Sequence, residues 1–230
     1  MNESSNSGIN TDNSISSKET INTSTSFERD IPIPEDIKKY IVKSISKSLK
    51  EIIKENIQNN QMEYIQRDIF YFNSVPGISL DDYINRIYKY TKMNISSLVM
   101  SIIYIDRFCE MNNGYVLCMN NIHKLLCTSC LVSVKFNEDI NINMKYFAEV
   151  AGLPVYDLNN LEFYFCLRLK FSFFVDYDIY QKYFEYFHKC VNMDNKEKEK
   201  INYDRNKTKN DNWKIFINYI FTKMFYYIYL

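Results

Sequence analysis

The sequence predicts an all-α protein, and three observations carry that prediction. Only four glycines and four prolines occur in 230 residues, which leaves few turn-forming residues for a fold of many strands. Apolar residues recur at three- and four-residue steps, the spacing of one face of an α-helix. Ser and Asn stand where these helices are expected to begin, and glycine stands where one is expected to end. No alternating strand pattern competes with this periodicity.

Residues 1–30 are rich in Ser, Asn and Thr and contain few large apolar groups. Such a segment cannot bury enough apolar surface to offset the entropy of ordering, so we predict a disordered polar tail. It holds no apolar run of signal-peptide length. The six cysteines show no disulfide-framework spacing, which favours a reducing compartment. We therefore expect the protein in the cytoplasm or the nucleus.

Residues 31–71 are predicted to form an N-terminal amphipathic helix and a connector. Pro32 and Pro34 punctuate the chain before the helix, and lysines occupy the face opposite its apolar residues. The apolar positions are Ile37, Tyr40, Ile41, Ile45, Leu49, Ile52 and Ile53. We interpret this helix as an extension of the domain that follows.

The main domain is expected over residues 72–190. Its first helix is predicted at about 80–91, where Ser79 can act as the N-cap because Asp82 follows three residues later, as in a capping box. The next helix follows Asn94 and reads ISSLVMSIIYIDRFCEM, which is apolar on nearly every side. A helix of this kind belongs at the centre of a bundle.

Three further helices complete a predicted bundle of five around this central helix. One contains NNIHKLLCTSCLVSVKF, whose small residues allow close packing. A short helix at about 143–151 should end at Gly152, and Pro154 suits the first turn of the helix after it. The apolar face of that last helix carries Leu158, Leu161, Phe165 and Leu169. A further aromatic helix, DIYQKYFEYFHKC, then follows.

The C-terminal part divides into a charged low-complexity linker, 191–212, and an aromatic segment, 213–230. The segment reads WKIFINYIFTKMFYYIYL and is about as long as a short membrane span. Lys223 lies inside it, and a lysine at the bilayer centre costs about 2.5–3.5 kcal/mol. Three interpretations stay open: a helix packed on the domain, an interfacial segment in contact with a membrane, or a tail anchor. We favour packing, because an exposed aromatic run promotes aggregation.

Composition and motifs argue against several classes of function. Lysine plus arginine and aspartate plus glutamate both total 28, so no net charge draws the chain to nucleic acid. The sequence has no phosphate-binding glycine loop, nucleophile elbow or histidine–carboxylate constellation. The paired acids Asp81-Asp82 and Glu138-Asp139 are explained by capping and solvation. We therefore expect a non-catalytic protein without cofactor or small-molecule substrate.

His123, Cys127 and Cys130 lie on one face of a predicted helix. This spacing invites a zinc interpretation, but a fourth ligand is missing and the second histidine is far away, at position 188. Cysteine is among the most frequently buried residues. The pair Cys127 and Cys130 also lacks the strand-to-helix context of a thiol redox motif. We expect core packing and no metal site.

Five segments of the chain form a specific signal when their order and spacing are taken together. They are VPGISLDDYINRIYKY at 75–90, IIYIDRF at 102–108, NIHKLLCTSCLVSVKFNED at 121–139, KYFAEVAG at 145–152 and LNNLEFYF at 158–165. In this respect the chain resembles the cyclin box, and specifically the Pho80-like or P-type cyclins. The resemblance covers roughly residues 70–190.

The resemblance implies a regulatory subunit that binds and activates a cyclin-dependent serine/threonine protein kinase. In that family a lysine that ends the third helix and a glutamate of the fifth hydrogen-bond to the kinase, and here they match Lys135 and Glu162. Asp106, Arg107 and His123 match structural positions of the box. Asp106 is expected to order helix ends rather than to touch the kinase.

A second function from another class stays open beside this one. A cyclin-fold adaptor can bind transcription factors or nucleic acid without activating a kinase, as transcription factor IIB does with two tandem boxes. One recognisable box and zero net charge argue against it, since phosphate binding needs a basic face. Pho80-like cyclins are associated with phosphate signalling and with the cell cycle, and the resemblance does not choose between them.

Overall fold

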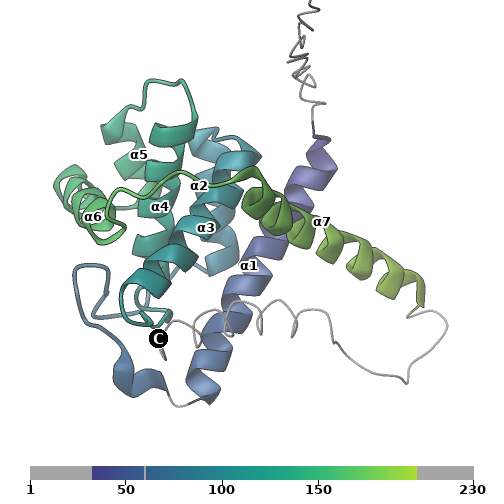
Figure 1. Ribbon diagram of the computed structural model, residues 1–230, viewed down its shortest axis with the longest axis horizontal. Helices are drawn as coiled ribbons and strands as arrows, with labels where there is room; N and C mark the ends of the chain where they lie inside the picture. The colour runs from purple at the N-terminus through teal and green to yellow at the C-terminus, as the bar shows by residue number, and fades with distance from the viewer. Residues whose placement is uncertain (1–32, 60, 201–230) are drawn as a thin grey trace, which may run out of the picture. The chain divides into compact units, whose positions relative to one another are not determined.

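The computed structural model describes residues 33–200 except residue 60, and all regular structure within this part of the chain is helical (Figure 1). The elements are α1 (Glu35–Gln58), the 3₁₀ helix η1 (Gln61–Tyr64), α2 (Leu80–Thr91), α3 (Ile95–Met111), α4 (Ile122–Asn137), α5 (Met144–Ala151), α6 (Val155–Arg168) and α7 (Tyr177–Lys200). The predicted polar tail, the aromatic segment 213–230 and most of the predicted linker lie outside the described residues.

The helices α2 to α6 form the predicted five-helix bundle. Its central helix is α4, which contacts α2, α3 and α6 and is buried along most of its length. The apolar helix α3 packs against α4, α6 and α7, and its residues Leu98, Val99 and Phe108 are fully buried. Small residues let α3 and α4 approach closely. The hydroxyl groups of Ser129 and Ser133 on α4 donate hydrogen bonds across this contact to backbone carbonyls of α3, at 2.6 and 2.7 Å. The prediction of an all-α bundle is confirmed, with α4 rather than α3 at its centre.

Local capping chemistry places two helix ends, the start of α2 and the end of α5, where the sequence predicted them. The backbone N–H of Asp82 donates to the Ser79 hydroxyl at 3.1 Å, and α2 begins at Leu80. Gly152 follows α5 with a φ of 71°, in the left-handed region that glycine adopts without penalty. Pro154 is the N-cap of α6 rather than part of its first turn, so this helix begins one residue later than expected.

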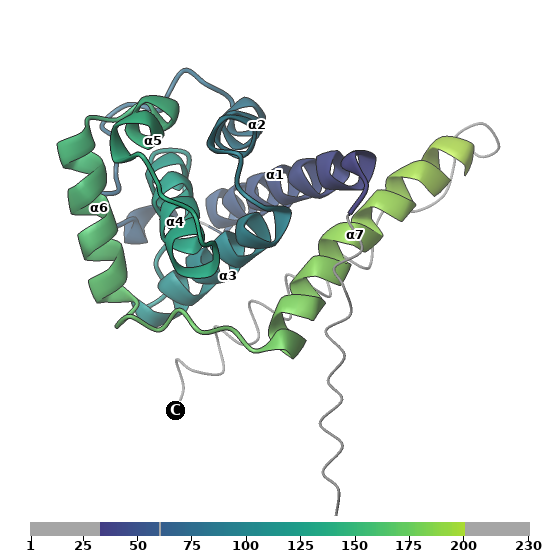
Figure 2. The same cartoon turned by 90° about the horizontal axis from the view of Figure 1, so that it is seen from above.

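The two outer helices, α1 and α7, are far apart in the sequence but pack against each other (Figure 2). The predicted apolar face of α1 is buried, including Ile41, Ile45 and Leu49. Helix α7 also contacts α3, and it continues to Lys200, into the segment that the sequence assigned to a linker. Residues 191–200 contain no glycine or proline and end in alternating Lys and Glu, which are good helix formers.

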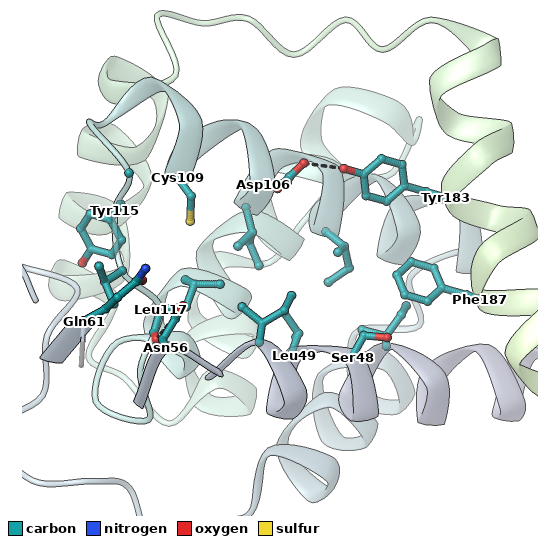
Figure 3. A pocket seen from close by; sticks show the side chains of 16 residues that line it. Ser48, Leu49, Asn56, Gln61, Asp106, Cys109, Tyr115, Leu117, Tyr183 and Phe187 are labelled. Carbon is teal, nitrogen blue, oxygen red and sulfur yellow. Dashed lines mark hydrogen bonds between the residues drawn. The ribbon is translucent and has the colours of Figure 1, made fainter. Parts of the chain in front are cut away.

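A cavity of about 60 Å³ lies between α1, α3 and α7 (Figure 3). Most of its lining is apolar, with Asn56 and Gln61 among its few polar residues. At the contact with α7, the Tyr183 hydroxyl donates to the Asp106 carboxylate. Helix α7 therefore meets α3 through this hydrogen bond as well as through the apolar residues that line the cavity.

None of the described helices combines the length with the apolar character that crossing a membrane requires.

Candidate partner-binding surface

Lys135 and Glu162 form a close ion pair on the surface of the bundle. Lys135 lies in the last turn of α4 and Glu162 lies within α6, and the packing of these helices brings the two side chains together. The Lys135 ammonium nitrogen is 2.7 Å from each oxygen of the Glu162 carboxylate. The side chains remain 38% and 20% exposed. The pair is therefore held in place and can still be reached by a partner.

Four exposed phenylalanines, here called the aromatic rim, occur on the elements that carry this pair or follow them. Their exposed fractions range from 53% to 73%, which is unusual for so apolar a side chain. They are Phe136, Phe163, Phe171 and Phe174. Two of them are direct neighbours in sequence of the charged residues. Exposed aromatic groups beside a fixed charge pair are typical of a protein-binding surface.

Part of the aromatic rim is supported from below by the ring of Phe173, which is mostly buried. The Phe136 ring lies 5.5 Å from it and the Phe171 ring 6.2 Å from it, measured between ring centroids. Lys170 and Phe171 both adopt left-handed backbone conformations, with φ of 50° and 55°. Such values are uncommon for residues other than glycine, so the sharp turn after α6 is held by its surroundings.

Helix α3 holds this turn from inside the bundle. The Arg107 guanidinium donates to the carbonyl oxygens of Ser172 and Phe174, the latter at 3.1 Å. The Tyr104 hydroxyl donates to the Phe173 carbonyl at 2.9 Å. These bonds fix the backbone that presents two members of the aromatic rim. Sequence reasoning missed Tyr104 as a support, because its partner is 69 residues away and leaves no periodic signal.

Asp106 lies within α3 rather than at a helix end. Its carboxylate accepts a hydrogen bond from the Tyr183 hydroxyl of α7. Besides the structural role expected for Asp106 within the bundle, this contact joins the bundle to an outer helix. The tertiary position of α7 decides this contact, since Tyr183 is 77 residues further along the chain.

His123 is buried between α4 and the segment that precedes α2. Its exposed fraction is 2%, and its Nε2 lies 3.2 Å from the Ile78 carbonyl oxygen. The imidazole ring also packs against the Tyr83 ring, with 4.9 Å between centroids. Burial lowers the pKa of His123, so the neutral ring is favoured, with Nε2–H donating to Ile78. His123 thus ties α4 to the entry of α2.

The cysteines of α4 pack in the core, as predicted. Cys127 and Cys130 are fully buried, and burial raises their thiol pKa values to about 11 and about 12. Burial and the nearby Glu162 carboxylate likewise raise the pKa of Cys166 to about 11. Thiols in this state are neither good nucleophiles nor ready metal ligands. Within the described residues, no group of three or more His, Cys, Asp or Glu side chains is arranged to hold a metal ion.

Two of the paired carboxylates lie at the starts of helices. Asp82 caps α2 with Ser79, and a Glu138 carboxylate oxygen accepts from the Asn94 backbone N–H at 2.9 Å, which supports the start of α3. The Asn94 side chain itself makes no capping hydrogen bond. Capping, as expected, accounts for these two acids, whereas Asp81 instead accepts hydrogen bonds from Ser46 and Lys50 of α1.

Comparison with known proteins gives a consistent match. A family model described as "Cyclin" matches residues 5–173, a range that includes both Lys135 and Glu162. The chain is 37% identical to Cyclin-U2-1 of Arabidopsis thaliana over 115 residues, which cover 50% of this chain and 52% of that protein. It is 34% identical to Cyclin-U4-1 of Arabidopsis thaliana over 125 residues, covering 54% and 62%.

A P-type relative is similar to the same degree. The chain is 37% identical to Cyclin-P4-1 of Oryza sativa subsp. japonica over 97 residues, which cover 42% of this chain and 46% of that protein. The relatives thus include both U-type and P-type proteins. The chain spans about half the length of the curated relatives it matches first.

Proposed function

This chain belongs to the cyclin family, and from that premise we propose that it is a regulatory subunit that binds and activates a cyclin-dependent serine/threonine protein kinase. One observation carries the proposal. The Lys135 and Glu162 side chains meet at 2.7 Å on the surface formed by α4 and α6, beside the aromatic rim. These are the two positions at which the resemblance to Pho80-like cyclins expects kinase contacts.

The charge pair is suited to fix the orientation of a partner. Each oxygen of Glu162 lies at 2.7 Å from Lys135, yet the ammonium group has three hydrogens and the carboxylate has further lone pairs. The remaining groups can bond to backbone carbonyl and N–H groups of a kinase. Removing one of them leaves such partner groups unsatisfied, at a cost of about 1–3 kcal/mol.

The aromatic rim supplies the apolar part of the same interface. Large aromatic side chains that enter pockets of a partner commonly contribute most of the binding energy. Phe136 is on the same helix as Lys135 and Phe163 on the same helix as Glu162, so a partner that covers the surface of α4 and α6 can contact both rings. Arg107 and Tyr104 act as positioning residues, since their hydrogen bonds fix the backbone around Phe173.

Binding at this surface can activate a kinase without chemistry on the cyclin itself. Activation requires a lysine and a glutamate of the kinase to meet around the ATP phosphates. A partner that holds the glutamate-bearing helix of the kinase inward shifts the population toward the active state. The proposed role is therefore non-catalytic, and the contribution of this chain is the shape and charge of its surface.

The test is a double variant, Lys135→Ala with Glu162→Ala, in affinity purification followed by mass spectrometry. We expect the variant to fold, because exposed ion pairs contribute at most about 1 kcal/mol to stability, but to recover far less kinase. The matched control removes the exposed Lys189 and Glu185 pair of α7, which are 2.9 Å apart. Kinase recovery equal to that of the control contradicts the assignment.

A kinase assay separates activation from adaptor binding. The kinase identified in this way is produced on its own and assayed with and without the added chain, and we expect phosphorylation only when the chain is present. A kinase that binds but is equally active alone contradicts the activating role and favours the adaptor function.

A further inference from the structure

The outer face of α1 carries a row of lysines with no other exposed residue among them. Between positions 39 and 54, every exposed residue is a lysine. The row, here called the lysine stripe, consists of Lys39, Lys43, Lys47, Lys50 and Lys54. Steps of three and four residues keep these side chains on one face, and the stripe is about 22 Å long at 1.5 Å per residue.

This arrangement does not stabilise the helix that carries it. Like charges at i and i+4 destabilise a helix, whereas mixed Glu and Lys rows stabilise it. Helix α1 is held instead by its opposite face, where Ile41, Ile45 and Ile53 are buried. The excess of positive charge is also local, because the chain as a whole has 28 basic and 28 acidic residues. The stripe is therefore a feature of this one surface.

The carboxylates that the structure describes neutralise the lysine stripe only in part. The Lys50 ammonium group donates to the Asp81 carboxylate of α2 at 2.6 Å. Within the described residues, Lys39, Lys43 and Lys54 form no ion pair. A negatively charged partner would gain most at these three lysines.

The spacing and composition of the stripe indicate what kind of anion fits. Lysines at i and i+4 are about 6 Å apart along the helix axis, and alternate residues of an extended peptide are about 6.6 Å apart. Carboxylates on alternate residues of such a peptide can therefore meet successive lysines. The exposed row contains no arginine or aromatic residue for reading or stacking bases, and no apolar residue for insertion into lipid.

We propose that the lysine stripe binds an extended acidic peptide segment of a partner protein. The site is separate from the proposed kinase surface. Helix α1 packs on α2 and α7, whereas the Lys135 and Glu162 pair joins α4 and α6. Figure 1 and Figure 2 both show α1 and α6 on opposite sides of α3 and α4. Peptide binding therefore needs no kinase and goes beyond the function proposed above.

The probe for the test is a fluorescein-labelled octapeptide with aspartate at alternate positions and serine between them. Its binding to the full chain is measured by fluorescence anisotropy at low salt. Two variants with the same net charge are compared, and both keep Lys50, so that its bond to Asp81 is preserved. The stripe variant is Lys39→Gln, Lys43→Gln, Lys47→Gln and Lys54→Gln. The control variant is Lys89→Gln, Lys145→Gln, Lys170→Gln and Lys182→Gln, all of them exposed in the structure.

We expect the stripe variant to bind the probe at least tenfold more weakly and the control variant to stay within twofold of the unmodified chain. The affinity should fall as salt is raised, and a peptide with asparagine in place of aspartate should not bind. Equal affinities of the two variants overturn the proposal. So does tighter, stripe-dependent binding of phosphatidylserine vesicles or of a single-stranded oligothymidylate than of the acidic peptide.

Discussion

The surface formed by α4 and α6 and the outer face of α1 both present charge, but they arrange it differently. On the first surface, Lys135 is neutralised by Glu162 at 2.7 Å and the exposed side chains nearby are aromatic. On the second, lysines follow one another: Lys50 is paired with Asp81, whereas Lys39, Lys43 and Lys54 form no ion pair within the described part of the chain. A neutralised pair with aromatic neighbours can be desolvated in an interface. A row of one sign acts through longer-range attraction that salt screens.

The difference separates two kinds of protein recognition, one through a buried interface and one through an exposed row of charges. A buried interface gains from apolar area and from a few hydrogen bonds of fixed geometry, and the Lys135 and Glu162 pair has that geometry before a partner arrives. An exposed row of lysines gains binding energy from the number of its charges and does not require a fixed geometry of each contact. The predictions below are ordered by the size of the effect and test whether the two surfaces differ in this way.

The largest effect is expected from Lys135→Ala alone. It leaves the Glu162 carboxylate and the kinase groups without their partner, and in a kinase interface such unsatisfied groups cost about 1–3 kcal/mol of binding free energy. In the free chain Glu162 stays hydrated, so the loss of folding stability should stay below about 1 kcal/mol. Titration calorimetry against the purified kinase and thermal unfolding measure the two quantities. Equal losses in binding and stability would show that the pair is only structural.

A smaller effect is expected from Phe163→Ala in the aromatic rim. Its side chain is 58% exposed, so truncation should change the free energy of unfolding by no more than about 0.5 kcal/mol. If the ring enters a pocket of the kinase, binding should weaken by about 1–2 kcal/mol. The control is Tyr64→Ala, an aromatic residue on η1 that is 71% exposed. Kinase binding that is as strong for Phe163→Ala as for Tyr64→Ala would contradict the proposal that the aromatic rim contacts the kinase.

The smallest effect is expected in how the free energy of unfolding depends on pH, which differs between His123 of α4 and Asp81, the partner of Lys50 on α1. His123 joins α4 to the segment before α2, and burial lowers its pKa below 6.5. Between its folded and unfolded pKa values the unfolded chain binds more protons, so the free energy of unfolding falls as the pH is lowered through about 6.5. The bond from Lys50 lowers the pKa of Asp81 below 3.8. Its contribution is present above pH 3.8 and is lost only as the pH falls through the lowered value.

Urea unfolding between pH 7.5 and pH 5 measures this slope. The variant His123→Gln should flatten it, whereas Asp81→Asn should leave the slope in this window unchanged, whatever its effect on overall stability. A slope that survives in His123→Gln would mean that another group causes it.

Features that depend on residues close together in sequence were predicted well. The Ser79 cap and the left-handed Gly152 place the start of α2 and the end of α5, because each acts within a single helical turn. The periodic apolar face of α1 and the apolar character of α3 likewise identify what is buried. The resemblance to cyclins singled out Lys135 and Glu162 as residues that share one surface. Their direct ion pair, across 27 residues, depends on how α4 packs on α6.

By itself the sequence determined the helical class, most helix boundaries and the lysines of α1, since periodicity and capping are local properties of the chain. Only the tertiary structure decided that α7 packs on α1, that Tyr183 reaches Asp106 and that Arg107 supports the turn after α6. Those contacts join residues far apart in sequence. Their formation depends on packing of the whole core, which no short segment encodes.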